Sequence, residues 1–157
     1  MARWIESWLP GTASSYPDTE ASNHPGERFG LPASGVASVA GFGRRAAALA
    51  VDWLLAYLVT LLFTGPAVLE TPYVGWLVLG VWAVLTALPV GVFGASAGMT
   101  VLGIRVADIG ERAVIGLPRA VLRTALIALV VPPLVRDSDG RGWHDRLTRT
   151  IVVRTRA

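Results

Sequence analysis

The sequence predicts an all-α membrane protein. We expect a transmembrane helical hairpin, a short broken or re-entrant third helical segment, and a small two-stranded β element on the cytoplasmic side. Of the 157 residues, 53% are hydrophobic and only 16% are charged. A soluble domain of this length could not bury so much apolar surface in one core. Two long apolar runs flanked by arginines therefore predict helices that cross a bilayer.

Residues 1–40 are polar and rich in proline, glycine, serine and alanine, which predicts a mostly disordered tail. Within it, the apolar side chains of residues 3–9 form one stripe of a short amphipathic helix that ends at Pro10. This segment either anchors at the membrane interface, docks on a partner, or has no role. The N-terminus lacks the apolar stretch of a secretory signal, so we expect the first apolar helix to direct insertion.

The membrane domain is expected over residues 41–157 and begins with two spanning helices. The apolar runs 46–69 and 73–93 each approach the roughly 20 residues needed to cross a bilayer. The loop between them contains Glu70 and no arginine. A short connection of this kind predicts an antiparallel hairpin.

A third apolar run covers residues 119–135, but its uncharged part is only about 12 residues long and contains Pro132 and Pro133. That length is more typical of a re-entrant or interfacial segment than of a full span, and adjacent prolines would break its far end. Six arginines then follow in the C-terminal cap 136–157. A complete third crossing would place all six outside.

Arginine counting gives the expected orientation in a bacterial cytoplasmic membrane. By the positive-inside rule, both flanks of the hairpin are cytoplasmic, the Glu70 loop is external, and the C-terminus is cytoplasmic. Two short runs rich in β-branched residues, 101–106 and 150–154, read as strands. Isolated strands are marginal in water, so we expect these two to pair on the same side of the membrane.

One carboxylate stands inside the first predicted span. Asp52 follows Arg45 by seven residues, close to two helical turns, so the two share a face. An ionised carboxylate in mid-bilayer costs about 2.5–3.5 kcal/mol on insertion scales, so Asp52 should face protein or water. The small residues Ala48 and Ala56 on this face would let another segment approach. We expect Arg123 to supply the partner, as a static buried ion pair or as part of a cation path.

The remaining charged residues give weaker signals. The run 137–146 resembles a calcium loop, but acidic ligand positions are missing, and residues 137–140 read instead as a turn. His144 has no second ligand at metal-binding spacing, so no metal or other cofactor is expected. Four further arginines are candidates for contact with anionic lipid head groups, unless they serve topology alone: Arg44, Arg105, Arg119 and Arg146.

Several classes of function are excluded on composition and motif. With no cysteine there are no disulfides, thiolate metal sites or thiol catalysis. The net charge of +3 is carried by arginines beside apolar runs, which favours an anionic lipid surface over nucleic acid. The chain has no phosphate-cradling loop, no dinucleotide fingerprint and no supported Ser–His–Asp set, so we do not expect an enzyme.

Four ordered blocks resemble the RDD family of small bacterial membrane proteins, named for one arginine and two aspartates. The blocks are GFGRRAAALAVDWL, GASAGMTVLGIRVAD, LPRAVLRT and GRGWHDRLTRTIVV, and the resemblance covers about residues 38–154. It places the arginine on Arg45, the aspartates on Asp52 and Asp145, and a further arginine on Arg123. The tail, with SWLPG and GERFGLPASGVASVA, looks like an actinobacterial subgroup.

This chain departs from the family pattern at two places. Met99 and Thr100 stand where the family usually carries basic residues, and Thr148 and Arg149 replace a small Ala-Gly-like pair. The resemblance implies a cytoplasmic-membrane protein, with cation–proton exchange proposed for some members. We therefore hold two hypotheses: an accessory or scaffold subunit of a larger envelope complex, or a homo-oligomeric transporter that exchanges a cation for protons through Asp52.

Overall fold

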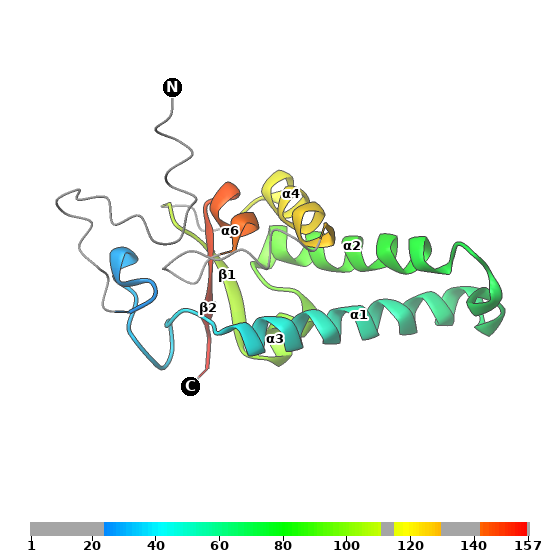
Figure 1. The fold of residues 1–157 in the computed structure, drawn as a ribbon, viewed down its shortest axis with the longest axis horizontal. Helices are drawn as coiled ribbons and strands as arrows, with labels where there is room; N and C mark the ends of the chain where they lie inside the picture. Colours follow the sequence, from blue (N-terminus) through cyan, green and yellow to red (C-terminus); the bar gives the residue numbers. More distant parts are fainter. Residues whose placement is uncertain (1–23, 111–114, 130–141, 157) are drawn as a thin grey trace, which may run out of the picture.

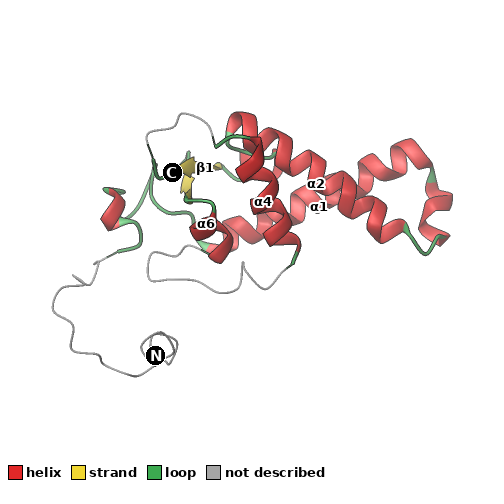
Figure 2. Ribbon diagram, turned by 90° about the horizontal axis from the view of Figure 1, so that it is seen from above, coloured by secondary structure: helices red, strands yellow, loops and turns green. Residues whose placement is uncertain are grey.

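A long helical hairpin extends from a compact end that holds the remaining elements (Figure 1). The computed structural model describes residues 24–110, 115–129 and 142–156. The hairpin consists of α1 (Phe42–Thr64) and α2 (Val74–Phe93), joined by the short 3₁₀ helix η3 (Pro66–Glu70). The two helices α1 and α2 run side by side in Figure 1, and seen from above their ribbons cross while α4 lies across the hairpin at the compact end (Figure 2).

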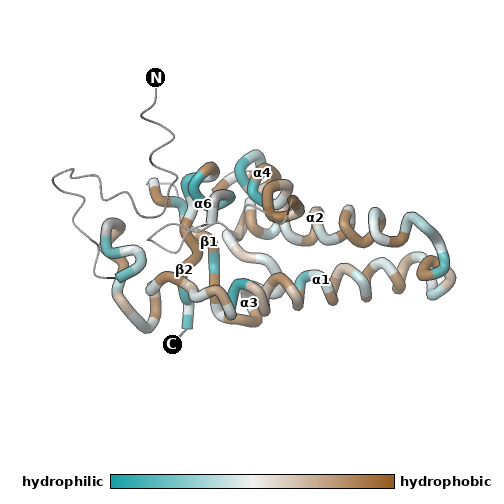
Figure 3. The backbone as a smooth tube through the Cα atoms, viewed as in Figure 1, coloured by the Kyte–Doolittle hydropathy of each residue, from teal (hydrophilic) through white to brown (hydrophobic). Residues whose placement is uncertain are grey.

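Both hairpin helices are long and apolar enough to cross a membrane. Only 22% of the most apolar window of α1 and 33% of that of α2 are buried within the protein. Most of the apolar surface of these helices therefore lies outside the protein core, as expected of helices that are surrounded by lipid. Figure 3 shows little strongly hydrophilic colour along the hairpin until its tip, whereas teal gathers in α4, α6 and the strands. The predicted hairpin is confirmed as a pair of candidate spans.

The helix boundaries differ slightly from those predicted. The first helix begins at Phe42 and ends at Thr64, where the predicted helix ran over 46–69. Gly65 adopts a positive φ of 74° and Pro66 follows, so the chain leaves the α-helix and makes a separate 3₁₀ turn. The second helix, Val74–Phe93, agrees with the predicted 73–93 to within one residue.

The two hairpin helices meet along a narrow seam. The buried side chains of α1 recur every four residues, which confirms that Asp52 shares a packed face with small alanines: Ala48, Asp52, Ala56 and Thr60. Across the seam, Trp82 of α2 is 1% exposed and stacks on Trp53 of α1, with ring centroids 5.3 Å apart. A stacked aromatic pair stabilises the packing of two helices beyond what the burial of its apolar surface contributes.

Beyond α2, the chain makes α3 (Ala97–Val101) and then β1 (Ile104–Asp108). This strand pairs antiparallel with β2 (Thr150–Arg154), and Val106 faces Val152 in the register. The predicted strand pairing is therefore confirmed. The first strand begins three residues later than predicted, because Ser96 caps the N-terminus of α3 by accepting a hydrogen bond from the backbone N–H of Met99.

The free edge of β2 is covered by the segment before α1. The backbone N–H of Ala37 donates to Arg154 O, that of Ala40 to Val152 O, and that of Arg154 to Ser38 O. The end of the predicted tail thus contributes to the small sheet. The predicted amphipathic helix at residues 3–9 lies outside the described residues.

Two short helices complete the compact end: α4 (Leu117–Ala128) and α6 (Trp143–Leu147). Helix α4 begins after Gly116 with Pro118 in its first turn and covers 12 residues, fewer than a bilayer span requires. The predicted third segment, 119–135, thus begins in a helix, but its end and the predicted turn 137–140 lie outside the described residues. The core of this end is apolar and draws on α1, α2, α3, α4 and both strands: Ala40, Ala48, Val90, Met99, Ile104, Val106, Ile115, Ala120 and Val152.

Candidate functional site

Asp145 lies at the centre of a buried charge cluster. Its side chain, on α6, has no exposed surface. Arg45 of α1 places Nη1 2.8 Å from Asp145 Oδ2, and Arg123 of α4 places both Nε and Nη2 3.1 Å from Oδ1. One carboxylate therefore connects three helices that are far apart in the sequence. Three of the four predicted ion-pair residues are brought together here.

The cluster has a second layer of polar contacts. His144 Nε2 lies 3.3 Å from Asp145 Oδ1, and the Thr150 hydroxyl donates to the same oxygen at 3.5 Å. The Thr148 hydroxyl, 3.0 Å from that of Thr150, donates to the carbonyl of His144 at 2.6 Å. Arg45 is oriented in turn by a bond from its Nε to the carbonyl of Ala40 at 3.0 Å. These contacts fix the side chains around the carboxylate.

The environment keeps Asp145 ionised. Burial alone would raise the pKa of its carboxyl group, but the positive charges of Arg123, His144 and Arg45 outweigh that effect and lower the pKa below its ordinary value of 3.8. Asp145 is the shared counter-charge of two guanidinium groups. Removing its carboxylate would leave the buried Arg123 and its neighbour Arg45 without that counter-charge.

Asp52 has different partners from those predicted. Its carboxylate accepts a 2.5 Å bond from the Ser96 hydroxyl and a 2.7 Å bond from the Gly98 backbone N–H. The predicted Asp52–Arg123 ion pair is wrong. Helix α4 directs Arg123 toward α6, where Asp145 meets it, while the first turn of α3 supplies Asp52 with neutral donors. Backbone N–H groups at a helix start are well suited to a carboxylate.

Gly98 permits this close approach. A Cβ atom at position 98 would overlap the backbone oxygen of Ala48 and lie 3.0 Å from Asp52 Cγ. The glycine-rich stretch 94–98 therefore serves α3–α1 packing. Ser96 and Gly98 were not predicted as partners of Asp52. The signal available was the serine three residues before Met99, a typical N-cap spacing.

The arginines predicted to contact lipid are in different environments. Arg119 is paired within the chain, its Nη1 lying 2.8 Å from Asp108 Oδ1 of β1. Arg105 and Arg146 are exposed, and Arg44 is half-buried near the start of α1. Contact of these four with anionic head groups stays a prediction.

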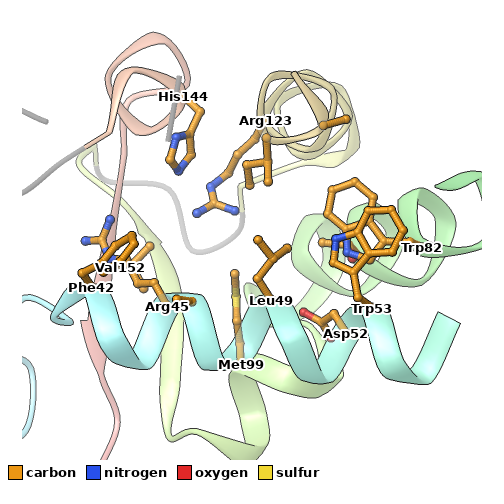
Figure 4. Close-up of a pocket in the computed structure, with 14 residues that line it drawn as sticks. Phe42, Arg45, Leu49, Asp52, Trp53, Trp82, Met99, Arg123, His144 and Val152 are labelled. Carbon is orange, nitrogen blue, oxygen red and sulfur yellow. The ribbon is translucent and has the colours of Figure 1, made fainter. Parts of the chain in front are cut away.

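A cavity of about 250 Å³ separates Asp52 from the Asp145 cluster. It lies between α1, α2, α4 and α6, and its wall is mostly apolar: Phe42, Arg45, Ala46, Leu49, Asp52, Trp53, Trp82, Thr86, Met99, Arg123, Ile127, Ala128, His144 and Val152. In Figure 4, Arg123 and His144 point into this space from α4 and α6, Leu49 and Met99 lie beneath, and Trp53 and Trp82 stand at the far end. This cavity was not predicted from the sequence.

The arrangement limits the chemistry that this site supports. Within residues 24–110, 115–129 and 142–156, no group of three or more His, Asp or Glu side chains is placed to hold a metal ion. Asp52 lines the cavity, whereas Asp145 lies behind Arg45, Arg123 and His144, and each carboxylate already accepts hydrogen bonds from the chain itself. The geometry is that of a packed junction with buried ionic contacts beside an apolar cavity.

Comparison with protein families matches residues 39–149 to the model described as "RDD family". No match was found among curated proteins or among solved structures. The matched region contains Arg45, Asp52, Arg123 and Asp145, all of which the structure places around the cavity or at its polar end.

Proposed function

The chain belongs to the RDD family, and from that premise we propose a non-enzymatic accessory or scaffold subunit of a larger cell-envelope membrane complex. The chain contains an RDD-family membrane-protein domain with two candidate spans. The observation that carries the proposal is that both motif carboxylates are engaged inside the chain, Asp52 by α3 and Asp145 by α1 and α4. Carboxylates that are bonded within the chain in this way hold its helices in position.

The proposed partners act through the surface of the hairpin. Large apolar side chains stay exposed along α1 and α2, among them Leu58 at 55%, Val84 at 55% and Leu88 at 51%. Two helices cannot enclose a path across a bilayer by themselves, but they offer faces on which other membrane helices can pack. A homo-oligomer or a larger hetero-complex would use the same faces.

We place this subunit in the bacterial cytoplasmic membrane with the compact end toward the cytoplasm. Arg44 and Arg45 stand at the start of α1 and Arg105 follows α2, whereas Glu70 lies at the tip of the hairpin. This distribution follows the positive-inside rule and supports cytoplasmic N- and C-termini. It accounts for the arginines without assigning a ligand to each of them.

Reciprocal purification tests the proposal. The tagged full-length chain, extracted in mild detergent, should recover a defined membrane protein in fixed stoichiometry, and tagging that protein should recover this chain. Depleting the chain should lower the partner's abundance in the membrane. Repeated recovery of the lone chain, with no partner lost on its depletion, would contradict an accessory role.

A transporter is the second candidate, because Asp52 belongs to a candidate span and lines the cavity. If an oligomer exchanges a cation for protons through this carboxylate, proteoliposomes should show cation flux driven by a pH gradient. The Asp52→Asn variant should abolish that flux while its amount in the vesicles stays normal. Glu70→Gln, at the hairpin tip, is the matched control. Absence of flux in the wild type, or equal flux in Asp52→Asn, would remove this candidate.

A further inference from the structure

Three buried polar groups at the cavity have no hydrogen-bond partner among the described residues. They are Nη1 of Arg123, Nε1 of Trp82 and the hydroxyl of Thr86. Arg123 is 2% exposed, Trp82 1% and Thr86 3%. Buried polar groups are nearly always hydrogen-bonded, and one left alone costs stability. These groups therefore call for an explanation.

All three groups belong to residues that line the same cavity. Trp82 and Thr86 are one turn apart on α2, and Arg123 points into the space from α4 (Figure 4). A guanidinium N–H and an indole N–H are obligate donors, and a hydroxyl can also donate. The cavity thus offers hydrogen-bond donors to an occupant that carries oxygen acceptors.

The rest of the cavity is suited to an apolar group. Leu49, Met99 and Ile127 line it, together with the stacked Trp53 and Trp82 rings. The cavity is open at its edge, because Phe42, 52% exposed, also belongs to the lining. An occupant can therefore enter from the surface at the base of the hairpin, where apolar spans meet the polar compact end (Figure 3).

We propose that this cavity binds the head-group phosphate of an anionic membrane lipid, with Arg123 Nη1 as the main donor. Arg45 and His144 face the same space, while Asp52 lies at the other end and is bonded to α3. Guanidinium groups favour phosphate oxygens. A space of about 250 Å³ holds a phosphate and the start of the lipid backbone. The acyl chains then lie outside, against the hairpin.

The site is independent of the accessory role. It differs from the surface arginines considered from the sequence, because its donor is a buried residue that also holds Asp145. Arg123 uses Nε and Nη2 for the carboxylate and directs Nη1 to the ligand, so one side chain serves both contacts. Lipid binding would then stabilise the same three-helix junction.

Titration of the purified full-length chain in neutral detergent tests the site. Phosphatidylglycerol and phosphatidylcholine with identical acyl chains are added, and binding is followed by native mass spectrometry. One phosphatidylglycerol should bind each chain at least about tenfold more tightly than phosphatidylcholine, because both lipids carry the phosphate but the choline cation would lie close to Arg45 and Arg123 and be repelled. Equal binding of the two lipids would overturn the proposal.

Three variants locate the binding. Arg123→Gln should weaken phosphatidylglycerol binding about tenfold or more. Arg156→Gln removes the same charge from an exposed position and should change binding less than about twofold. Thr86→Leu replaces a hydrogen-bonding hydroxyl in the cavity wall by a larger apolar side chain, leaves the Asp145 cluster untouched and should also weaken binding, so it decides the matter if Arg123→Gln does not fold. Full binding by Thr86→Leu, or equal loss in Arg156→Gln, would contradict the site.

Discussion

At the scale of single residues, the two buried carboxylates are compensated in different ways. Asp52 is held by a hydroxyl and a backbone N–H, whereas Asp145 is held by the guanidinium groups of Arg45 and Arg123. The neutral donors need no second charge within the candidate span. The ionic contacts lie at the base of the hairpin, where they join separate elements. The two aspartates of one motif therefore have distinct structural roles.

Asp145 gives a pH-dependent prediction. Its pKa is lower in the folded protein than its ordinary value of 3.8, so its ionised form stabilises the fold fully above about pH 5. That contribution is lost as the pH falls below 3.8. Asp145→Asn should cost about 3–5 kcal/mol near neutral pH, because two guanidinium groups lose their common partner. The difference in free energy of unfolding from wild type should stay constant above about pH 5 and shrink as the pH falls below 3.8.

The measurement is unfolding in detergent, followed by tryptophan fluorescence at each pH. Asp108→Asn is the matched control at neutral pH, because its partner Arg119 keeps 29% of its side chain exposed. A pair open to solvent on one side is screened and should contribute about 1 kcal/mol or less. Equal losses in the two variants, or a pH-independent loss in Asp145→Asn, would contradict the structural importance of the cluster.

Arg149, one of the residues at which this chain departs from the family pattern, has a backbone conformation that favours glycine. Its φ is +53°, in the left-handed region that costs a side-chain-bearing residue about 1–2 kcal/mol. Arg149→Gly should therefore raise the unfolding temperature, whereas Arg149→Ala, which loses the same charge but keeps Cβ, should not. Thermal unfolding of the two variants side by side measures this. A gain in Arg149→Ala as large as in Arg149→Gly would point to charge instead of backbone.

At the scale of elements, α3 determines how the compact end meets the first span. Its five residues start at the Ser96 cap, and the cap hydroxyl also donates to Asp52 of α1. The backbones of Gly98 and Ala48 pack without a side chain between them. A helix this short has little stability of its own, so its contacts with α1 hold it in place.

Gly98→Ala should destabilise the fold. The added methyl group would overlap the carbonyl oxygen of Ala48 and crowd Asp52, and overpacking against backbone costs about 1–3 kcal/mol. Gly80→Ala is the control, because a Cβ at that position in α2 meets nothing within 4 Å and alanine favours a helix. The unfolding temperature should fall for Gly98→Ala alone. Equal unfolding temperatures for the two variants would exclude the tight contact between Gly98 and Ala48.

The pairing of β1 with β2 predicts the topology. Hydrogen-bonded strands lie on one side of a membrane, so the chain between Asp108 and Thr150 makes an even number of complete crossings, zero included. A reporter fused to the C-terminus should therefore be cytoplasmic, and a reporter inserted after Glu70 external. A C-terminal reporter on the external side, with the Glu70 reporter also external, would contradict the pairing in the membrane.

At the scale of the whole molecule, a charge cluster joins a compact polar end to an apolar hairpin. Arg45, Arg123 and Asp145 come from α1, α4 and α6, and the contact between Arg45 and Asp145 spans 100 residues of sequence. Only a small part of the surface of α1 and α2 is buried within the protein, so apolar packing of the hairpin gives little hold on the compact end. The cluster and the α3 contact supply that connection.

The sequence predicted the hairpin and the strand pair because each depends on local length and composition. The long apolar runs required spans, and the β-branched run at residues 150–154 required a partner. The ion pairs depend on how α4 and α6 pack, which no local pattern records. Charge compensation suggested Arg123 for Asp52, but the neutral donors Ser96 and Gly98 supply its hydrogen bonds, and no charge at those positions pointed to them.

If the Arg123–Asp145 contact holds the compact end on the hairpin, a double-mutant cycle in lipid-free detergent will show it. Arg123→Gln, Asp145→Asn and the double variant are compared with wild type by free energy of unfolding. We expect the double variant to lose at least about 1 kcal/mol less than the sum of the single losses. Single losses that add to within about 0.5 kcal/mol would contradict it.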